Sequence, residues 1–345
     1  MVKQLKFFTS ISINPGDIRK IQKLLADHEV QVNPLAQILI TPLFASKSSL
    51  QLIRNLKEQQ PTTVMFDSGG YYVQTGRITY QELYYPLLQF YRQNHWADIY
   101  TLPDYVPTSQ DAPDLVQHKV EETAKYSRLF YLEMPDELKP KAMGVVQGHS
   151  IAQVEICLNT YFQLGIKKIG FGSFGTVGEN SQTNVATDKA VNLAKYVVDM
   201  AKRENATVHF FGIGVPALIA MIYGSGAASF DSSSWLKSAG FGQIFLPFSR
   251  SYNITHRNGS AAMHRGIRIE DFVKLRNFTE HSCPFCECVE NLQQHKLYRA
   301  VHNLICMQET IDRVNDQDLS FIEKVYVHGS PKYRQEFEKW LSPIN

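Results

Sequence analysis

Long apolar runs are absent from this chain of 345 residues. No stretch approaches the roughly 20 consecutive apolar residues that a membrane-spanning helix needs. The first residues, MVKQLKFFTSISINPG, also lack the apolar segment of a secretion signal. We therefore expect a cytoplasmic protein that has no membrane partner.

A strong net charge is absent too. The formal charge is +2, from 35 Lys and Arg against 33 Asp and Glu. This balance excludes a histone-like tail and a disordered polyelectrolyte. Any surface that binds nucleic acid must therefore be a local basic patch, where some of the 17 Tyr and 20 Phe could stack on bases.

Cysteines are few, and their number, five, is odd. Cys283, Cys286 and Cys288 crowd together, whereas Cys157 and Cys306 lie in apolar helical patterns that predict core positions. This distribution argues against a disulfide framework. It favours metal binding in a reducing compartment.

No Gly-x-Gly-x-x-Gly follows the first apolar run, which removes the main reason to expect an open doubly wound sheet. Short apolar runs instead alternate with amphipathic stretches, the pattern of an α/β protein. Strands are predicted at QILITPLF, TTVMFDS, DIYTLPD, KAMGVVQG, KKIGFGS, TVHFFGIG and AASFDSS. Helices are predicted at 48–59, 80–94, 114–132, 150–164 and 188–203. The repeat predicts a (β/α)8 TIM barrel.

The alternation stops after about residue 275, where a Cys/His-rich segment leads into helical patterns at 294–313 and 331–341. We expect two parts. Residues 1–275 form the catalytic barrel, and residues 276–345 form a zinc-binding subdomain with the C-terminal helices.

Active sites of this fold lie at the C-terminal ends of the strands. Polar residues that end the apolar runs are therefore the site candidates. They are Asp67, Asp104, Gln147, Gly172, Ser173 and Asp231.

Asp67 and Asp231 are the two carboxylates that stand out. Asp67 is followed by Ser68, Gly69 and a second glycine, which let the backbone approach a flat ligand, although such a sequence also makes a simple tight turn. Asp231 could equally cap a helix. Together the two carboxylates suit a glycosidic exchange, in which one displaces a base covalently and the other handles its proton.

The segment HSCPFCEC at 281–288 predicts a zinc site. The spacing of Cys283 and Cys286 lets both thiolates reach one tetrahedral ion, and His302 can complete the site from a helix. His281 and Cys288 are the main candidates for the fourth ligand, and His295 is a weaker one. Four protein ligands would make the zinc structural. The alternative is a set of cysteines that binds no metal.

Basic residues gather between Asp231 and the cysteines, and phosphate binding is the functional interpretation. An ordinary solvated surface explains them equally well. The residues proposed to bind nucleic acid are Lys237, Arg250, Arg257 and Arg265.

Motifs spread over residues 60–310 resemble those of tRNA-guanine transglycosylases in the same order. They are MFDSGG, GVVQG at 144–148, FGIGVP followed by FD at 230–231, RNG at 257–259, CPFC at 283–286 and HN at 302–303. The resemblance implies a zinc-containing (β/α)8 enzyme that swaps guanine for a 7-deazaguanine through a covalent nucleotide intermediate.

On that resemblance Asp231 is the nucleophile and Asp67 is the general acid/base. Asp104, Gln147 and the loop that begins at Gly172 would hold the guanine edge. Tyr71 stands where the family has an aromatic residue after the glycines. The complete base-binding set is Ser68, Gly69, Tyr71, Asp104, Gln147, Gly172 and Ser173.

Several departures bear on the substrate. Tyr72 stands where tRNA enzymes usually have Gln. His281 stands where they have the first Cys of the zinc motif, so the resemblance implies His281 as the fourth zinc ligand, with Cys288 as the alternative. The segment between Asp231 and Arg257 is also longer. Residues 232–256, with Trp235, Phe241, Phe245 and Phe248, are predicted to contain a wedge or stacking element that helps open a duplex, and a barrel helix and loop with a local core is the alternative. These features resemble the phage and bacterial DNA branch, the DpdA-like enzymes, which implies a preQ0-like base placed in DNA within a bacterial or phage-infected cytoplasm.

Other classes of protein remain open at this stage. The same motifs could belong to an enzyme that acts on tRNA, or to a silent subunit that only binds nucleic acid. A barrel hydrolase or aldolase for a small metabolite is a third class, which the Cys/His cluster disfavours.

Overall fold

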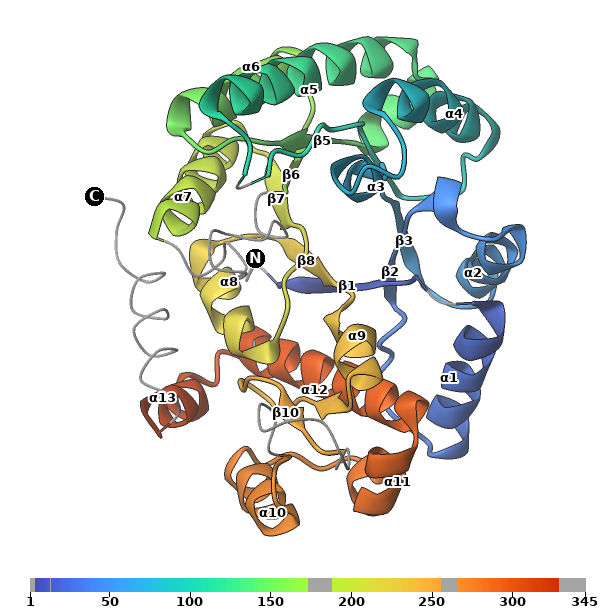
Figure 1. The fold of residues 1–345 in the computed structure, drawn as a ribbon, viewed down its shortest axis with the longest axis vertical. Coiled ribbons are helices and arrows are strands. Elements are labelled where there is room, and N and C mark those ends of the chain that lie inside the picture. The colour runs from blue at the N-terminus through green and yellow to red at the C-terminus, as the bar shows by residue number, and fades with distance from the viewer. Residues whose placement is uncertain (1–3, 13, 109, 173–187, 256–265, 329–345) are drawn as a thin grey trace.

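Eight parallel strands close into a barrel in chain order. The computed structural model describes residues 4–12, 14–108, 110–172, 188–255 and 266–328. Helices surround the barrel, as Figure 1 shows. The (β/α)8 prediction is confirmed. The strands are β1 (Lys6–Ser10), β2 (Gln37–Ile40), β3 (Thr63–Phe66), β4 (Ile99–Thr101), β5 (Ala142–Val146), β6 (Lys168–Phe171), β7 (Thr207–Phe210) and β8 (Ser229–Ser232).

Seven of these strands coincide with apolar runs from which a strand was predicted, whereas β1 was not predicted. The run KFFTS mixes two Phe with Lys, Thr and Ser, so its own pattern is weak. Its neighbours decide its conformation, because β1 pairs with β8 on one side and with β2 on the other. The last pairing, between β1 and β8, closes the barrel.

Side-chain caps set where several of the helices begin. The Ser46 hydroxyl accepts the Ser49 amide at the start of α2, and Thr79 with Glu82 forms a capping box at the start of α4. The five helices expected between 48 and 203 are confirmed to within one residue at each end. The helices up to β8 are α1 (Pro15–Asp27), α2 (Lys47–Gln59), α3 (Gly70–Gln74), α4 (Tyr80–Gln93), α5 (Pro113–Glu133), α6 (Ile151–Gln163), α7 (Asp188–Arg203) and α8 (Ile219–Ser225).

Apolar side chains fill both faces of the strands, as a parallel sheet buried on both faces requires. A small cluster inside the barrel contains Phe8, Leu39, Met65 and Met143. The large cluster lies between the strands and the outer helices. The barrel is therefore a packed scaffold, and its strand ends can hold side chains in fixed positions.

The chain after β8 packs against the barrel. Helix α12 runs beside α9 and also contacts α1 and β1 (Figure 1). The boundary expected at 275/276 stays a prediction and falls within α10, while the helix expected at 331–341 lies outside the described residues. The elements are α9 (Ser234–Gly240), β9 (Gln243–Ile244), β10 (Tyr252–Asn253), α10 (Ile269–Phe278), α11 (Val289–Gln294), α12 (Lys296–Asn315) and α13 (Leu319–His328).

None of the helices in the described part of the chain combines the length and apolarity that crossing a membrane requires.

Candidate active site and metal centre

A pocket of about 560 Å³ opens at the C-terminal ends of the strands. Its volume lies in the range of small-molecule sites. Side chains from strands far apart in the sequence meet in it, because each follows or ends a barrel strand. The polar side chains that line it include Ser10, Thr41, Asp67, Asp104, Gln147 and Asp231, and Gly172 and Gly212 line it with their backbone.

Asp67 follows β3 and has a perturbed proton affinity. Burial, with the negative charge of Asp104 as the next cause, raises the pKa of Asp67 to about 7. The Thr41 hydroxyl donates to Asp67 Oδ2 at 2.9 Å, and the Gly69 amide donates to the same oxygen at 3.3 Å. This carboxyl group can therefore take up and release a proton near neutral pH.

Asp104 lies deeper and is held from both sides. The Ser68 hydroxyl donates to Oδ1 at 2.7 Å, and the Gln147 amide donates to Oδ2 at 2.7 Å. Burial raises the pKa of Asp104. Oε1 of Gln147 is buried and has no hydrogen-bond partner among the described residues. A carboxylate and an amide oxygen thus offer acceptor positions side by side.

Two glycines make room for these side chains. A Cβ on Gly70 would lie 2.6 Å from Asp104 Oδ1, and a Cβ on Gly172 would lie 2.5 Å from Gln147 Nε2. A side chain at Gly70 would displace the Asp104 carboxylate, and one at Gly172 would displace the Gln147 amide. The glycines after β3 and β6 therefore leave the space that the Asp104 and Gln147 side chains occupy at the bottom of the pocket.

Asp231 lies in β8, is 6% exposed and has a different environment. The Ser10 hydroxyl donates to Oδ2 at 2.6 Å, and the Gly212 amide donates to Oδ1 at 2.9 Å. Nε2 of His209 is 3.5 Å from Oδ1. The sequence analysis did not single out Ser10, His209 or Gly212. A polar residue within the apolar run TVHFFGIG was the one signal for His209.

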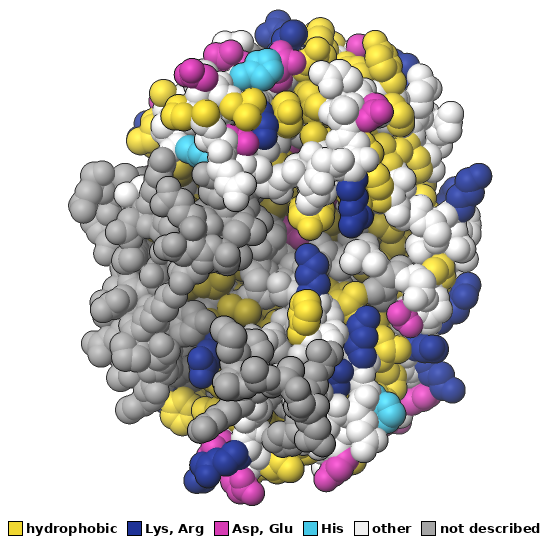
Figure 2. Space-filling view, in the orientation of Figure 1, with side chains coloured by type: hydrophobic (Ala, Val, Ile, Leu, Met, Phe, Trp, Pro, Cys, Tyr) yellow, Lys and Arg dark blue, Asp and Glu magenta, His cyan; other side chains and the backbone are white. Residues whose placement is uncertain are grey.

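Aromatic and basic side chains form the rim of the pocket. Tyr71 is 56% exposed, and the Lys237 ammonium lies over its ring, 5.8 Å from the centroid. Tyr72 stacks on Phe44 at 3.6 Å between centroids, and the Arg77 guanidinium lies 5.3 Å from the Tyr72 centroid. Figure 2 shows Lys and Arg side chains beside a hollow in the centre of this face. We call these five residues the pocket rim.

The other basic candidates divide by position. Arg250 is exposed and lies over the Tyr252 ring, 5.4 Å from its centroid, but it does not line the pocket. Arg257 and Arg265 lie outside the described residues, as does Ser173.

Phe245 and Phe248 of the predicted duplex-opening element are buried, and the role predicted for Trp235 is wrong. Its side chain is fully buried, so it cannot reach a base. Trp235 is the second residue of α9 and packs in the large core cluster. Phe241, at the end of the same helix, is 70% exposed.

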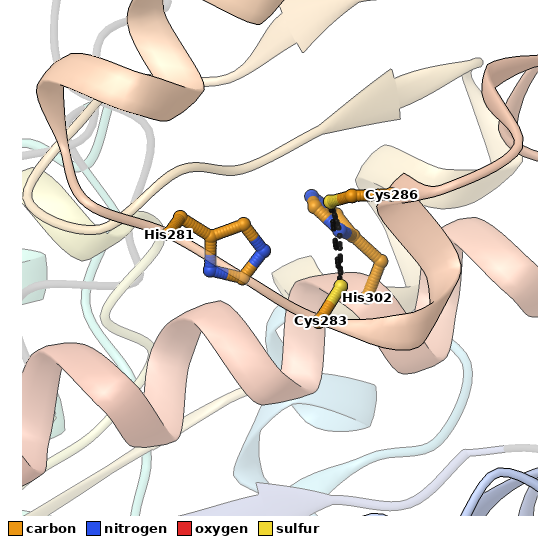
Figure 3. Close-up of side chains that lie close together, drawn as sticks. All are labelled: His281, Cys283, Cys286 and His302. Carbon is orange, nitrogen blue, oxygen red and sulfur yellow. Dashed lines mark hydrogen bonds between the residues drawn. The ribbon is translucent and has the colours of Figure 1, made fainter.

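Four side chains of the Cys/His segment converge on one point. The potential ligand atoms of His281, Cys283, Cys286 and His302 all lie within 4.8 Å of one another, and all four residues are buried. Figure 3 shows the two sulfurs beside the His302 ring, with His281 facing them. Nδ1 of His302 is 3.4 Å from Cys283 Sγ and 3.3 Å from Cys286 Sγ.

In each of the two histidines, a hydrogen bond at one ring nitrogen leaves the other nitrogen available as a metal ligand. His302 Nε2 lies 2.8 Å from the Phe245 carbonyl oxygen, which fixes its proton there and leaves Nδ1 as the ligand atom. His281 Nδ1 lies 2.6 Å from Glu309 Oε2, which leaves Nε2 as its ligand atom. This donor set is compatible with a closed, structural zinc site.

Cys288, the alternative fourth ligand, lies apart from this cluster. It is exposed, and its sulfur lies 3.4 Å from Glu290 Oε2. Cys306 lies closer, with Sγ 3.6 Å from His281 Nε2. Its full burial agrees with the core position predicted for it.

The protein is a closed α/β barrel with carboxylates at its strand ends and a zinc-type Cys/His cluster packed on its side. This combination is typical of a barrel enzyme with a structural metal site. The model of the queuine tRNA-ribosyltransferase (TGT) family matches residues 91–317, and the chain belongs to this family. Membership implies guanine transglycosylase activity, a pentosyl transfer, and a nucleic-acid substrate. No curated protein matches the chain significantly.

The match covers Asp104, Gln147, Asp231 and the Cys/His cluster, while Asp67 precedes the matched residues. The resemblance to the transglycosylase superfamily is confirmed. The assignment to its DNA branch stays a prediction.

Proposed function

We propose that the protein exchanges guanine in DNA for a 7-deazaguanine derivative through a covalent intermediate on Asp231. One observation carries this proposal. Two carboxyl groups of one pocket differ in their surroundings. Asp231 accepts hydrogen bonds from Ser10 and Gly212, whereas burial, with the charge of Asp104, raises the pKa of Asp67 to about 7 despite its own hydrogen bonds. Such a division suits a nucleophile and a proton donor.

In the first half of the reaction, a carboxylate oxygen of Asp231 attacks C1′ of the nucleotide. The C1′–N9 bond breaks, and its electron pair leaves with the guanine, which takes the proton of Asp67. In the second half, Asp67 removes a proton from the incoming base. The nitrogen of that base then displaces Asp231, which leaves as a carboxylate.

Asp104 and Gln147 are the residues proposed to recognise the base by hydrogen bonds. Guanine presents the N1–H and the exocyclic amine as neighbouring donors on one edge, and Asp104 with Gln147 Oε1 offers acceptors to match. Ser68 holds Asp104 in place. Gly69 turns the chain in the left-handed conformation at φ 94°, and Tyr71 offers a ring for stacking.

The pocket rim is the proposed contact with the nucleic acid. Lys237 and Arg77 can bind phosphates, and Phe44, Tyr71 and Tyr72 can stack on bases that flank the target. A guanine paired in a duplex must leave the stack before its glycosidic bond is accessible. The rim would then hold the opened strand beside the pocket. Arg250, Arg257 and Arg265 are proposed as more distant phosphate contacts.

The proposed zinc is structural. His281, Cys283, Cys286 and His302 would hold it, and its binding energy would stabilise the fold of the Cys/His segment. No step of the exchange needs it.

Exchange into tRNA is the second candidate, because the matching family model is described for a tRNA enzyme. The departures at Tyr72 and His281 favour DNA. Both substrates share the same nucleophile and the same proton donor, so a single assay can separate them.

The test is incorporation of labelled guanine and labelled 7-deazaguanine into duplex DNA, single-stranded DNA and tRNA. We expect incorporation into DNA that falls at least a thousandfold in Asp231→Ala, since removing a nucleophile costs on the order of that factor or more. Asp136→Asn, an exposed carboxylate paired with Lys139 away from the pocket, is the matched control and should keep wild-type activity.

Incorporation into tRNA alone would replace DNA by the second candidate. Equal activity of wild type and Asp231→Ala would show that another group is the nucleophile. No incorporation into any of the three would contradict the proposed activity.

A further inference from the structure

His209 is a polar side chain at the apolar interior of the barrel. It lies in β7 and is 1% exposed. Its ring contacts Phe8 edge-on at 5.6 Å and Phe211 at 4.6 Å, measured between ring centroids. Both of these residues pack with the small cluster inside the barrel. Burying an imidazole in such surroundings costs free energy unless both of its nitrogens have hydrogen-bond partners.

The two nitrogens of His209 differ in their partners. Nδ1 lies 2.9 Å from the Ser229 hydroxyl. Nε2 is buried without a hydrogen-bond partner among the described residues, and it faces Asp231 Oδ1 at 3.5 Å. That distance exceeds a normal N–H···O bond by a few tenths of an ångström. Catalytic hydrogen bonds are often long before substrate binds and shorten in the complex.

The Asp231 carboxylate favours one tautomer of His209, and the Ser229 hydroxyl can accommodate it. If the Ser229 hydroxyl donates to Nδ1, the ring proton resides on Nε2 and points at the carboxylate. The opposite tautomer would place two lone pairs against each other, on Nε2 and on Oδ1. The first arrangement is the favourable one, because an N–H faces a carboxylate oxygen.

We propose that His209 is a positioning residue for Asp231, and that its Nε2–H stabilises the carboxylate form of the nucleophile. The inference rests on the proposed function. His209 contacts neither the sugar nor the base in this scheme. It acts on the reaction through Asp231, together with the donors from Ser10 and Gly212.

The two halves of the exchange depend on this contact in opposite ways. Attack on C1′ turns the Asp231 carboxylate into an ester and removes its negative charge, which weakens the bond from Nε2–H. Displacement by the incoming base breaks the ester bond and restores the charge, which strengthens it again. His209 therefore favours release from the covalent intermediate over its accumulation.

The test compares His209→Phe and His209→Gln. Phe keeps a ring against Phe8 and Phe211 but has no donor. Gln keeps an amide N–H at about the position of Nε2. Both are assayed for exchange, and both are mixed with nucleic acid without added base, after which the covalent adduct is counted on a denaturing gel.

We expect His209→Phe to lower kcat by on the order of tenfold to a hundredfold, as for a lost hydrogen bond to a charged group, with KM within about twofold. Its adduct fraction should exceed that of wild type. His209→Gln should recover most of kcat and the wild-type adduct fraction. Ser229→Ala, which removes the hydroxyl partner of Nδ1, should fall between the two.

A purely packing role would give a different result. It would lower the thermal stability of both variants without changing the adduct fraction, and that outcome overturns the inference. Wild-type kcat and adduct fraction in a folded His209→Phe protein would overturn it as well. Absence of exchange by the wild type would instead overturn the proposed function, and the inference with it.

Discussion

Asp67 and Asp231 are chemically identical side chains with different partners. The Thr41 hydroxyl and the Gly69 amide reach Asp67, but burial and the charge of Asp104 outweigh them and raise its pKa. Asp231 accepts hydrogen bonds from the Ser10 hydroxyl at 2.6 Å and from the Gly212 amide at 2.9 Å, and His209 Nε2 lies 3.5 Å from its Oδ1. The environments of the two groups, and not their residue type, separate their proposed roles.

The raised pKa of Asp67 predicts a stability cost at high pH. The folded protein holds this proton up to about pH 7, whereas the unfolded chain releases it near 3.8. Between those values the folded state binds more protons, so the free energy of unfolding falls as the pH rises. Asp67→Asn removes the cost and should be more stable than wild type at pH 8, by at most about 4 kcal/mol.

Urea unfolding at pH 4 and pH 8 measures this difference. The gain should vanish toward pH 4, where the folded wild type is already protonated at Asp67. Asp114→Asn, an exposed carboxylate on α5, should show no such pH-dependent gain. A variant less stable than wild type at pH 8 would mean that the bonds from Thr41 and Gly69 outweigh the burial of the charge.

Helix α12 is the element that joins the Cys/His segment to the barrel. Its Asn303 accepts the Phe245 amide at 2.7 Å and donates to the Trp235 carbonyl at 3.0 Å. One helical turn on either side of Cys306 are His302 and Thr310, and Glu309 reaches His281. Helix α12 therefore holds both the Cys/His cluster and the region around α9 in place.

Glu309 should control how tightly the cluster holds zinc. Its carboxylate fixes the His281 ring, and loss of such a partner typically lowers metal affinity tenfold to a hundredfold. We expect Glu309→Gln to show that loss in competition with a chromogenic chelator. Glu290→Gln is the matched control, because the Glu290 carboxylate accepts a hydrogen bond from the exposed Cys288 and, among the described residues, has none with the cluster. Equal zinc affinity in the two variants would contradict the role of Glu309.

The spacing identified this segment but left the fourth ligand open, whereas the family resemblance favoured His281, which the structure places in the cluster. Cys283, Cys286 and His302 follow from the two-residue spacing and a later helix. His281 was one of two main candidates, and the choice depends on the turn that buries His281 and exposes Cys288. A turn of this kind is decided by packing against α12, which no local pattern records.

At the scale of the whole molecule, a nearly neutral chain carries its basic groups locally. The pocket rim places Lys237 and Arg77 at the mouth of the pocket, although the formal charge is only +2. Binding of nucleic acid at this face should therefore depend on salt through a few contacts and not through a broad field.

Lys237→Ala should weaken binding of single-stranded oligonucleotides and reduce the slope of log affinity against log salt by about 0.7 to 1. Fluorescence anisotropy at several salt concentrations measures the slope. Lys125→Ala is the control, because Lys125 pairs with Glu122 on α5 and lies outside the pocket. The same slope in both variants would remove Lys237 from the nucleic-acid surface.

The sequence by itself determined the barrel, seven of its strands, the strand-end positions of Asp67 and Asp231, and most of the metal cluster. Each of these leaves a local mark, such as an apolar run, a strand-ending carboxylate or a fixed cysteine spacing. The tertiary structure decided β1, the burial of Trp235, and the meeting of Ser10, His209 and Gly212 at Asp231. These contacts join residues up to 221 positions apart. They exist only because the barrel closes and brings β1, β7 and β8 together.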